Sequence, residues 1–171
     1  MQADNSPLAS AQDILIRPIQ AADNPEVAQL IRTVMTEYTC VGEGYSINDP
    51  EVDHMSEAYA GPKASFFVIV DAEGIAGCGG IAPLKNGSAD VCELQKMYFY
   101  QRLRGKGLGR QLLHLCLDQA RQFGYRRCYL ETVARMKKAN ALYQKAGFQL
   151  LKEQIGQTGH GACDLYYVLD L

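Results

Sequence analysis

The sequence predicts an α/β domain in which a central mixed β-sheet is flanked by helices on both faces. Runs rich in β-branched and aromatic residues alternate with runs of helical periodicity, and several strand-like runs follow one another directly. Strands and helices that alternate around one core imply this layered architecture. The third observation is a glycine-rich turn at residues 104–110, set between a strand and a helix, around which the rest of the chain is organised.

Two helices are expected between the first two strands. Residues 14–19 form a short β-rich run, and residues 65–71 form a denser one. A helix begins near Asp23, with apolar residues behind it at helical spacing. Asp49-Pro50 opens a second, shorter helix that runs to about residue 59.

The remaining chain continues the alternation. A hairpin turn is expected at Asn86-Gly87, because this dipeptide favours tight turns. The full order is then β-α-α-β-β-β-α-β-α-β-β, the later elements being strands at residues 75–84 and 89–99, a helix ending near residue 121, a strand at 127–133, a helix at 139–145 and a hairpin of 148–155 and 162–169.

Length and composition indicate a single globular domain. The chain has 171 residues, of which 47% are apolar and 21% are charged, and its net charge is −2. That charge gives no reason to expect binding to nucleic acid or to an anionic membrane, and no apolar run approaches the roughly 20 residues that span a bilayer. Residues 1–12 lack the features of a secretory signal, so we expect a disordered lead-in before one domain over residues 13–171.

The cysteines and histidines do not suggest a metal site. The six cysteines include no CxxC pair, and no two histidines have metal-ligand spacing. Free cysteines in apolar segments indicate a reducing cytoplasm. His114 is expected on the solvent face of a helix. His54 and His160 lie in segments that could border a substrate, although ordinary surface positions are the favoured interpretation.

The glycine-rich turn is expected to bind phosphate. It reads Arg104-Gly105-Lys106-Gly107-Leu108-Gly109-Arg110, and apolar residues at helical spacing follow it. A helix start offers free backbone N–H groups and the positive end of the helix dipole, and glycine lets an anion approach the main chain closely. Three cationic side chains in the turn add positive charge.

The turn differs from two common phosphate loops. A P-loop needs Ser or Thr after Gly-Lys, but Lys106 is followed by Gly107, and a dinucleotide fingerprint needs G-x-G-x-x-G where this chain has G-x-G-x-G. The pattern that fits is Arg-x-x-Gly-x-Gly, at Arg104, Gly107 and Gly109. It resembles the pyrophosphate loop of the GNAT superfamily of N-acetyltransferases, and the predicted order of elements is similar to that fold from about residue 14 onward.

This resemblance implies that acetyl-CoA is the cosubstrate and that the whole turn contacts it: Arg104, Gly105, Lys106, Gly107, Leu108, Gly109 and Arg110. In the preceding strand, apolar residues move from even positions at Cys92 and Leu94 to odd positions at Met97 and Phe99, as a β-bulge would cause. A strand buried on both faces would explain the pattern equally well. In the family the strand is bulged, which implies cofactor contacts from Met97, Tyr98 and Phe99, with the Met97 N–H polarising the thioester.

Glu93 is the candidate general base. A carboxylate in this apolar strand is costly unless it is hydrogen-bonded or faces a cleft, and several family members have their base at this position. An ion-paired structural Glu, with Lys96 as its partner, is the alternative interpretation. Glu131, near the end of the next strand, is a second candidate for the base.

The segment from Ala139 to Phe148 resembles the family's A-x-x-LY-x-K-x-GF signature. By that resemblance Tyr143 is the general acid that protonates the departing thiolate, although an amphipathic core position would also explain it. The chain departs from the family at Met136, where an Asn usually contacts the cofactor, and at Gln101, where Pro is common. Asn140, one turn before Tyr143, is a candidate to replace the missing contact.

Together these features predict an N-acetyltransferase in which a primary amine attacks the thioester directly. The alternatives are a non-catalytic acyl-CoA-binding or regulatory domain of the same fold and, less favoured, a nucleotide-binding domain. Residues 33–62 contain no Lys or Arg but six acids, which would favour a cationic small molecule or a lysine-like amine as acceptor, if they are more than solvated helix faces. The acceptor could also be a peptide, and the sequence leaves a homodimer open.

Overall fold

The computed structural model describes residues 13–171, so the expected lead-in lies outside the described residues. Seven strands form one sheet in the order β1-β2-β3-β4-β5-β7-β6. Only β4 and β5 pair in parallel, and the other neighbours are antiparallel. The strands are β1 (Leu15–Pro18), β2 (Ser65–Asp71), β3 (Gly74–Pro83), β4 (Val91–Phe99), β5 (Arg127–Thr132), β6 (Gln149–Leu151) and β7 (Leu165–Asp170). The predicted mixed sheet is confirmed.

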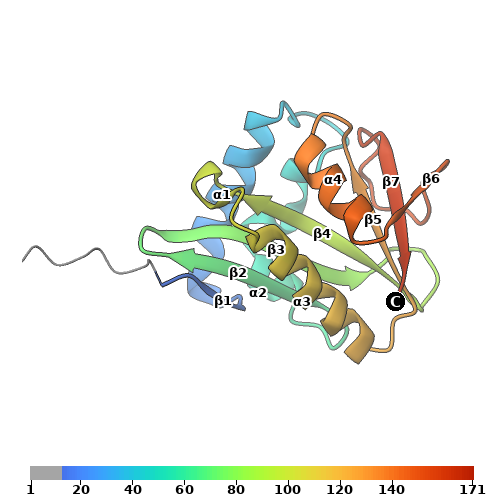
Figure 1. Ribbon diagram of the computed structural model, residues 1–171, viewed down its shortest axis with the longest axis horizontal. Coiled ribbons are helices and arrows are strands. Elements are labelled where there is room, and N and C mark those ends of the chain that lie inside the picture. The colour runs from blue at the N-terminus through green and yellow to red at the C-terminus, as the bar shows by residue number, and fades with distance from the viewer. Residues whose placement is uncertain (1–12) are drawn as a thin grey trace, which may run out of the picture.

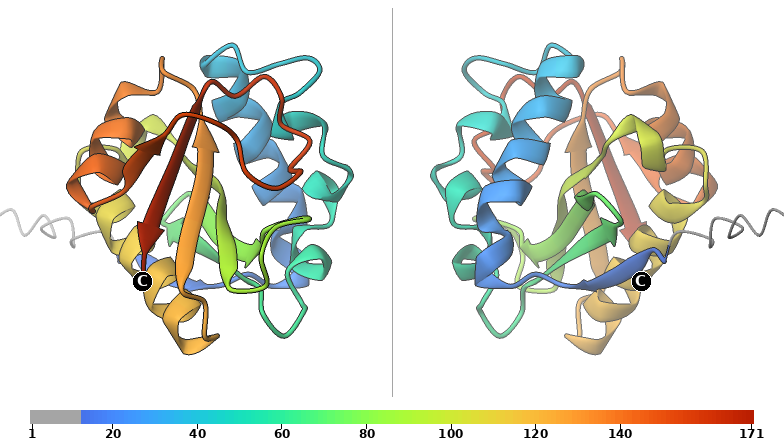
Figure 2. Two further views of the ribbon diagram at one scale, coloured as in Figure 1. Left: turned by 90° about the vertical axis from the view of Figure 1, so that its right-hand side faces the viewer. Right: turned by 90° about the vertical axis from the view of Figure 1, so that its left-hand side faces the viewer.

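Helices cover both faces of this sheet (Figures 1 and 2). One apolar core lies under α3 (Leu108–Gln122) and α4 (Lys137–Lys145), and a second lies under α1 (Asn24–Glu37) and the short α2 (Met55–Ala58). The apolar residues of α3 that predicted a helix point into the first core, where Leu112, Leu113 and Cys116 are fully buried. No helix among residues 13–171 combines the length and the apolar character that crossing a bilayer requires.

The structure corrects three predicted elements. The helix expected from Asp49-Pro50 to residue 59 is a 3₁₀ turn (Pro50–Asp53) followed by α2, because His54 between them has a non-helical backbone. The final hairpin exists, but β6 has only three residues and the connection over residues 152–164 is long. The turn at Asn86 has a positive φ of 53° as expected, although it lies within a longer link between Pro83 and Val91.

Strand β4 contains the bulge that its apolar phase shift predicts. Its register with β3 pairs Gly80 with Gln95 and Cys78 with Tyr98, so β4 has one residue more than β3 across this interval. Lys96 takes the irregular backbone, with φ of 52°. The bulge removes Lys96 and Met97 from the regular ladder and leaves their backbone groups available for other partners.

Beyond the bulge, β4 separates from its parallel neighbour. Residues Val91 to Glu93 pair with Arg127 to Tyr129, but no pairing continues although both strands do. The sheet therefore opens on one side of Glu93. Side chains and backbone groups that would otherwise be covered by a neighbouring strand face this opening.

Two glycines of β3 allow aromatic side chains to pack closely against the sheet. A Cβ on Gly77 would lie 2.8 Å from the Phe99 ring, and one on Gly80 would lie 2.4 Å from the Ser65 carbonyl oxygen. Glycine has a low propensity for strands, but at these two positions the neighbouring residues leave no room for a side chain.

Gly80→Ala tests this requirement. We expect the free energy of unfolding to fall by about 1–3 kcal/mol, because the added methyl group meets backbone that cannot move aside easily. Urea unfolding of the variant measures the change. Gly61→Ala is the matched control, since a Cβ there has no neighbour within 4 Å. Equal stability of the two variants would contradict the packing argument.

Candidate active site

Two cavities meet at the opening between β4 and β5. The first, which we call the groove, runs along β4 to the start of α3 and is lined by Val34, Tyr38, Met97, Tyr98, Phe99, Leu103, Arg104, Gly105, Gly107, Gly109, Arg110, Met136, Lys138, Ala139, Leu142 and Tyr143. The second, which we call the pocket, has among its lining residues Glu93, Lys96, Glu131, His160 and Cys163. Both cavities are lined by Met97, Tyr98, Met136 and Tyr143.

The glycine turn presents open backbone at the end of the groove. Gly105 and Gly107 have positive φ values of 75° and 77°, and a Cβ on either would meet nothing within 4 Å. Within residues 13–171, no main-chain carbonyl accepts a hydrogen bond from the N–H groups of residues 105–110. The first N–H groups of α3 are thus free to bind an anion, as the sequence predicts.

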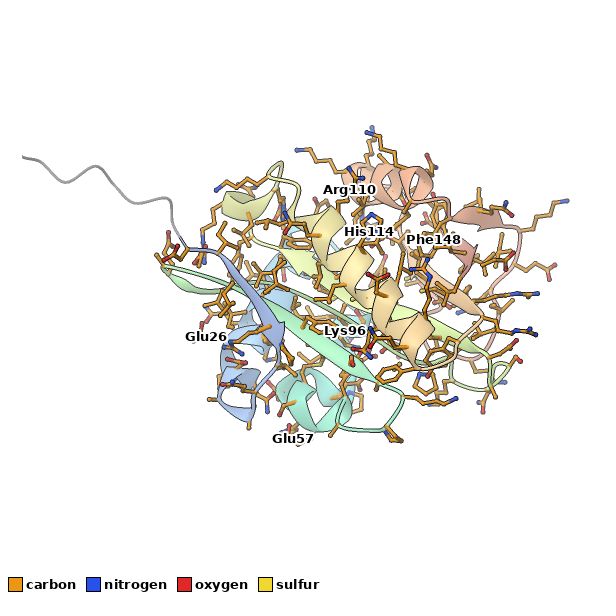
Figure 3. The ribbon with its side chains drawn as sticks, turned by 60° about the horizontal axis from the view of Figure 1, so that its bottom comes forward. Glu26, Glu57, Lys96, Arg110, His114 and Phe148 are labelled. Atoms are coloured by element: carbon orange, nitrogen blue, oxygen red, sulfur yellow. The ribbon has the colours of Figure 1, made fainter. Side chains whose placement is uncertain are left out.

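The cations of the turn are used differently from one another. The Arg104 guanidinium donates to both oxygens of Glu37, at 2.5 and 2.9 Å, and to the Phe99 carbonyl oxygen at 2.9 Å. Its charge is therefore already balanced by a carboxylate. Arg110 lines the groove on the first turn of α3 (Figure 3), whereas Lys106 is exposed beside it.

Most of the predicted cofactor residues line the groove, and three do not. Lys106 lies outside it, and Leu108 is buried in the core beneath α3. Asn140 is also buried: its Nδ2 donates to the carbonyl oxygens of Val133 and Ala134, at 3.0 and 3.5 Å. Asn140 thus fixes the loop that leads into α4, and its Oδ1 is a buried atom without a hydrogen-bond partner among the described residues.

Met136 occupies the position where the resemblance leads us to expect an asparagine. It begins the turn into α4, and its thioether lies 3.9 Å from the Thr132 hydroxyl. Because it lines both cavities, it supplies an apolar wall where the asparagine of the family would supply a polar one.

Tyr143 stands where the two cavities meet. Its ring packs against Phe148 and Tyr167, with ring centroids 5.9 and 6.2 Å away. No residue in the described part of the chain forms a hydrogen bond with its hydroxyl, and the residue lines both cavities. Burial raises the pKa of Tyr143 above its ordinary value, so the hydroxyl stays protonated at neutral pH and can donate a proton.

Glu93 lies at the base of the pocket with only 3% of its surface exposed. Its Oε2 accepts a hydrogen bond of 2.7 Å from Gln95, which in turn accepts one from the Tyr59 hydroxyl. Burial raises the pKa of Glu93 to about 7, and the Glu131 charge adds to the rise, while the Gln95 hydrogen bond opposes it. A carboxyl group that titrates near neutral pH is suited to accept a proton from a substrate.

Glu131, the second candidate base, is heavily hydrogen-bonded. Its carboxylate accepts from the Tyr129 hydroxyl and the Gln154 amide, both at 2.8 Å, and from the Thr158 hydroxyl at 2.9 and 2.8 Å. These bonds tie β5 to the loop before β7. Glu131 therefore acts as a structural anchor for one wall of the pocket, and Glu93 has the freer carboxylate.

His160, for which the sequence favours an ordinary surface position over one that borders a substrate, lies in the wall of the pocket. Its Nε2 lies 3.0 and 2.9 Å from the two carboxylate oxygens of Asp49. Asp49 also accepts a 2.8 Å hydrogen bond from the buried Lys96 amine, which reaches Glu51 at 3.2 Å. The sequence held one weak signal for Asp49, its place before Pro50, which indicates a helix start. Asp49 does precede a 3₁₀ turn there, but its side chain makes no capping hydrogen bond.

The acids of residues 33–62 do not form an unpaired acidic wall. Asp49 and Glu51 bind Lys96, Asp53 binds Arg32 at 2.7 Å, and Glu37 binds Arg104. Glu57 accepts hydrogen bonds from Asn24 and Ser56. None of the six acids lines the pocket. The expected attraction for a cationic acceptor is thus weakened, because cations from other segments balance most of this charge.

No group of three or more His, Cys, Asp or Glu side chains within residues 13–171 is placed to hold a metal ion. The six cysteines are free thiols, and burial raises the pKa of Cys78, at the centre of the sheet, to about 12. Such thiols are poor nucleophiles and poor metal ligands near neutral pH.

Comparison with known proteins identifies the class. The model of the acetyltransferase (GNAT) family matches residues 28–148. The chain is 40% identical over 161 residues to the uncharacterized N-acetyltransferase YjgM of Escherichia coli, which covers 94% of this chain and 96% of the relative. The fold and these matches define an acetyltransferase.

Solved structures share the fold at lower identity. An acetyltransferase of the GNAT family from Staphylococcus aureus has a TM-score of 0.79 at 18% identity, covering 92% of this chain and 99% of that one. The structure of yncA from Salmonella typhimurium, determined with its cofactor acetyl-CoA, has a TM-score of 0.72 at 20% identity and covers 92% and 94%. The chain belongs to the acetyltransferase (GNAT) family.

The raised pKa of Glu93 makes stability depend on pH. The folded protein holds this proton more tightly than the unfolded chain, whose carboxyl has an ordinary pKa of 4.5. The stability that the protonated group contributes is therefore present below pH 4.5 and is lost as the pH rises through about 7.

Glu93→Gln removes this titration. We expect the wild-type protein to lose stability relative to Glu93→Gln as the pH rises from 4.5 to 8, as measured by urea unfolding at each pH. Glu153→Gln, at an exposed position, is the control and should show a constant difference from wild type. If the difference in unfolding free energy between wild type and Glu93→Gln is also independent of pH, the pKa of Glu93 is not raised in the folded protein.

Proposed function

We propose that the protein transfers an acetyl group from acetyl-CoA directly to a primary amine. The observation that carries this proposal is the junction of the two cavities at Met97 and Tyr143. One cavity ends at a free helix start suited to phosphate, and the other ends at a carboxyl group suited to accept a proton. The chemistry of an acetyl transfer needs both, and it needs them to meet.

The residues of the groove fit the cofactor. The free N–H groups after Gly105 would bind the pyrophosphate, with Arg110 beside them. The apolar wall over Phe99 and Leu142 suits the pantetheine chain, and the bulge at Met97 offers unpaired backbone groups to its amides and to the acetyl carbonyl. The cofactor supplies an activated thioester. That a relative of the same fold was determined with acetyl-CoA supports this assignment.

The roles proposed for the pocket residues follow from their protonation states. An alkylamine such as lysine has a pKa of about 10.4 and is mostly protonated at pH 7, so it must lose a proton before it can attack. Glu93 would accept that proton, directly or through water. The Met97 N–H would stabilise negative charge on the acetyl oxygen, a contribution of roughly 3 kcal/mol where such donors have been removed from other enzymes. Tyr143 would protonate the departing sulfur.

The acceptor is proposed to be an amine that enters the pocket as a cation, with Glu93 and Glu131 as the carboxylates nearest to it. This proposal includes lysine-like side chains and small polyamines. Residues 33–62 give this proposal little support, because most of their acids have partners within the protein. Lys96 and His160 on the same wall would tolerate a second, negatively charged group on the acceptor.

A direct assay tests the function. The protein is mixed with acetyl-CoA and a panel of amines that contains spermidine, a lysine-containing peptide, free amino acids and an aminoglycoside, and release of the free thiol is followed. We expect steady thiol release with at least one amine and its acetylated product by mass spectrometry. Binding of acetyl-CoA without turnover across the panel would support the non-catalytic alternative instead.

Gly109 provides a test of the cofactor groove. It lies in the first turn of α3, and a Cβ there would point towards Leu142 and the Phe99 ring at ordinary contact distances. Gly109→Glu should weaken acetyl-CoA binding by about 10²-fold or more relative to Gly109→Gln, because it sets a negative charge against the phosphates. Calorimetric titration measures both. An acidic residue is favourable at a helix start, so a folding defect is not expected; equal affinities would place the anion site elsewhere.

Tyr143→Phe tests the proton donor. We expect kcat to fall by about 10²-fold while acetyl-CoA affinity changes little, because the ring remains and only the hydroxyl is lost. Tyr167→Phe is the matched control, since that buried tyrosine packs against the same ring. Wild-type turnover in Tyr143→Phe would reduce Tyr143 to a packing residue.

A further inference from the structure

His160 lines the pocket and pairs with Asp49, a residue from a distant segment that does not itself line the pocket. Asp49 lies between two short 3₁₀ turns after α1, and His160 lies in the loop between β6 and β7, 111 residues later. The His160 side chain is 12% exposed, and the Asp49 side chain is 18% exposed. His160 also lines the pocket that contains Glu93, so the pair belongs to the acceptor side of the site.

The pair fixes how the imidazole ring is used. Both contacts to Asp49 are made by Nε2, at 3.0 and 2.9 Å. A carboxylate can only accept, so in the neutral ring Nε2 carries the proton and Nδ1 carries the lone pair. Within residues 13–171, no hydrogen bond is made to Nδ1. The nitrogen that can accept a proton is thus the one left free for a molecule in the pocket.

Asp49 is itself held in place on its other side. The buried Lys96 amine, on the bulge of β4, donates to Asp49 at 2.8 Å and to Glu51 at 3.2 Å. Burial works against ionisation of Asp49, but the hydrogen bond from His160 and the charge of Lys96 outweigh it and lower its pKa. Asp49 therefore remains a carboxylate that can stabilise an imidazolium opposite it.

The proposed reaction removes two protons from the acceptor nitrogen. An ammonium acceptor starts with three protons on nitrogen and ends with one in the amide product. One proton must leave before the nitrogen attacks, so that its lone pair is free, and one must leave after the new N–C bond forms. The sulfur takes up one proton through Tyr143, and solvent receives the other. Glu93 alone would have to accept both in turn within one cycle.

We propose that His160, oriented by Asp49, is a second general base of the acceptor pocket. In this step Nδ1 takes a proton from the amine nitrogen, the N–H bond breaks with its electron pair left on nitrogen, and the imidazolium formed is balanced by Asp49. The proton passes to solvent when the product leaves. His160 is then a catalytic residue and Asp49 is a positioning residue. The proposal rests on the acetyl transfer proposed above.

The charges that face His160 set the pH range of this base. Asp49 and Glu93 are negative and Lys96 is positive, with Glu131 and Cys163 also in the pocket wall. Burial lowers the pKa of His160, but the hydrogen bond and charge of Asp49, with the charge of Glu93, raise it above its ordinary value overall. His160 is therefore protonated at low pH and becomes a base as the pH rises through its pKa. The acid side of the rate profile should follow this titration.

The kinetic test uses the amine with the highest kcat/KM in the panel. His160→Gln should lower kcat/KM for that amine by about 10²-fold, with acetyl-CoA affinity unchanged. Asp49→Asn should shift the acid limb of the pH profile to lower pH, because loss of the carboxylate lowers the pKa of the imidazole. The effect of Asp49→Asn is also measured in a Glu93→Gln background. Glu93 cannot titrate there, so a shift of the acid limb can be assigned to His160.

Two control variants distinguish a catalytic His160 from a His160–Asp49 contact that only holds two loops together. Glu51→Gln also removes one carboxylate from Lys96 but leaves Asp49 and His160 in contact. His114→Gln makes the same substitution as His160→Gln at an exposed site on α3 (Figure 3). Both controls should retain the wild-type pH profile. A uniform loss at every pH in Asp49→Asn, or the same loss in Glu51→Gln, would reduce the pair to a structural tie and overturn the proposal.

A spectroscopic arm does not depend on activity. Nitrogen NMR of ¹⁵N-histidine in the free protein, assigned with His160→Gln, should show the Nε2–H form of His160 above its pKa, and Asp49→Asn should lower that pKa. The Nδ1–H form, or a pKa that Asp49→Asn leaves unchanged, would overturn the proposal even in a protein for which no acceptor is found. Failure of every amine in the panel would instead count against the proposed acetyl transfer.

Discussion

The site depends on the separation of two neighbouring strands. β4 and β5 pair in parallel from Val91 to Glu93 and then part, although both continue. A strand normally satisfies its backbone groups through both neighbours, so a parted strand must find other partners or expose them. The bulge at Lys96 releases backbone groups at the same place. The groove and the pocket both exist because this part of the sheet is not closed.

The opening also brings ionisable groups into a poorly solvated place. Glu93 titrates near neutral pH because burial disfavours its charged form. Lys96, with a side chain 1% exposed, forms ion pairs there with two carboxylates, those of Asp49 and Glu51. Asp49 links the two effects, since it stabilises Lys96 on one side and His160 on the other. A change at Asp49 therefore alters the surroundings of both Lys96 and His160.

The features that could be predicted from the sequence are those that neighbouring residues determine together. The phase shift from Leu94 to Met97 made a bulge one of two interpretations, because strand periodicity is local, and the family resemblance favoured it. The glycines at 105 and 107 predict the open turn, because the backbone conformation that glycine allows is also local. Tyr143 is recognisable from a short signature. These patterns also sufficed for the order of the elements and for most residues of the groove.

The features that could not be predicted depend on contacts between distant segments. The Asp49–His160 pair joins residues 111 positions apart, and neither lies in a periodic segment. The pairing of Arg104 with Glu37 spans 67 positions and removes a cation that the turn seemed to offer. The pairing of the acids of residues 33–62 could not be predicted for the same reason. Their cationic partners come from β4, α1 and the turn before α3.

The buried Lys96 has a consequence for the integrity of the protein itself. Lys96 places a primary amine in the wall of the pocket of an acetyltransferase. Acylation needs a nitrogen lone pair, and the Lys96 amine is instead bound as a cation by Asp49 and Glu51, with almost no access to solvent. The two carboxylates thereby hold the buried amine in place, so the ion pairs of Lys96 shape this wall and also fix the segment of Asp49 and Glu51 against β4.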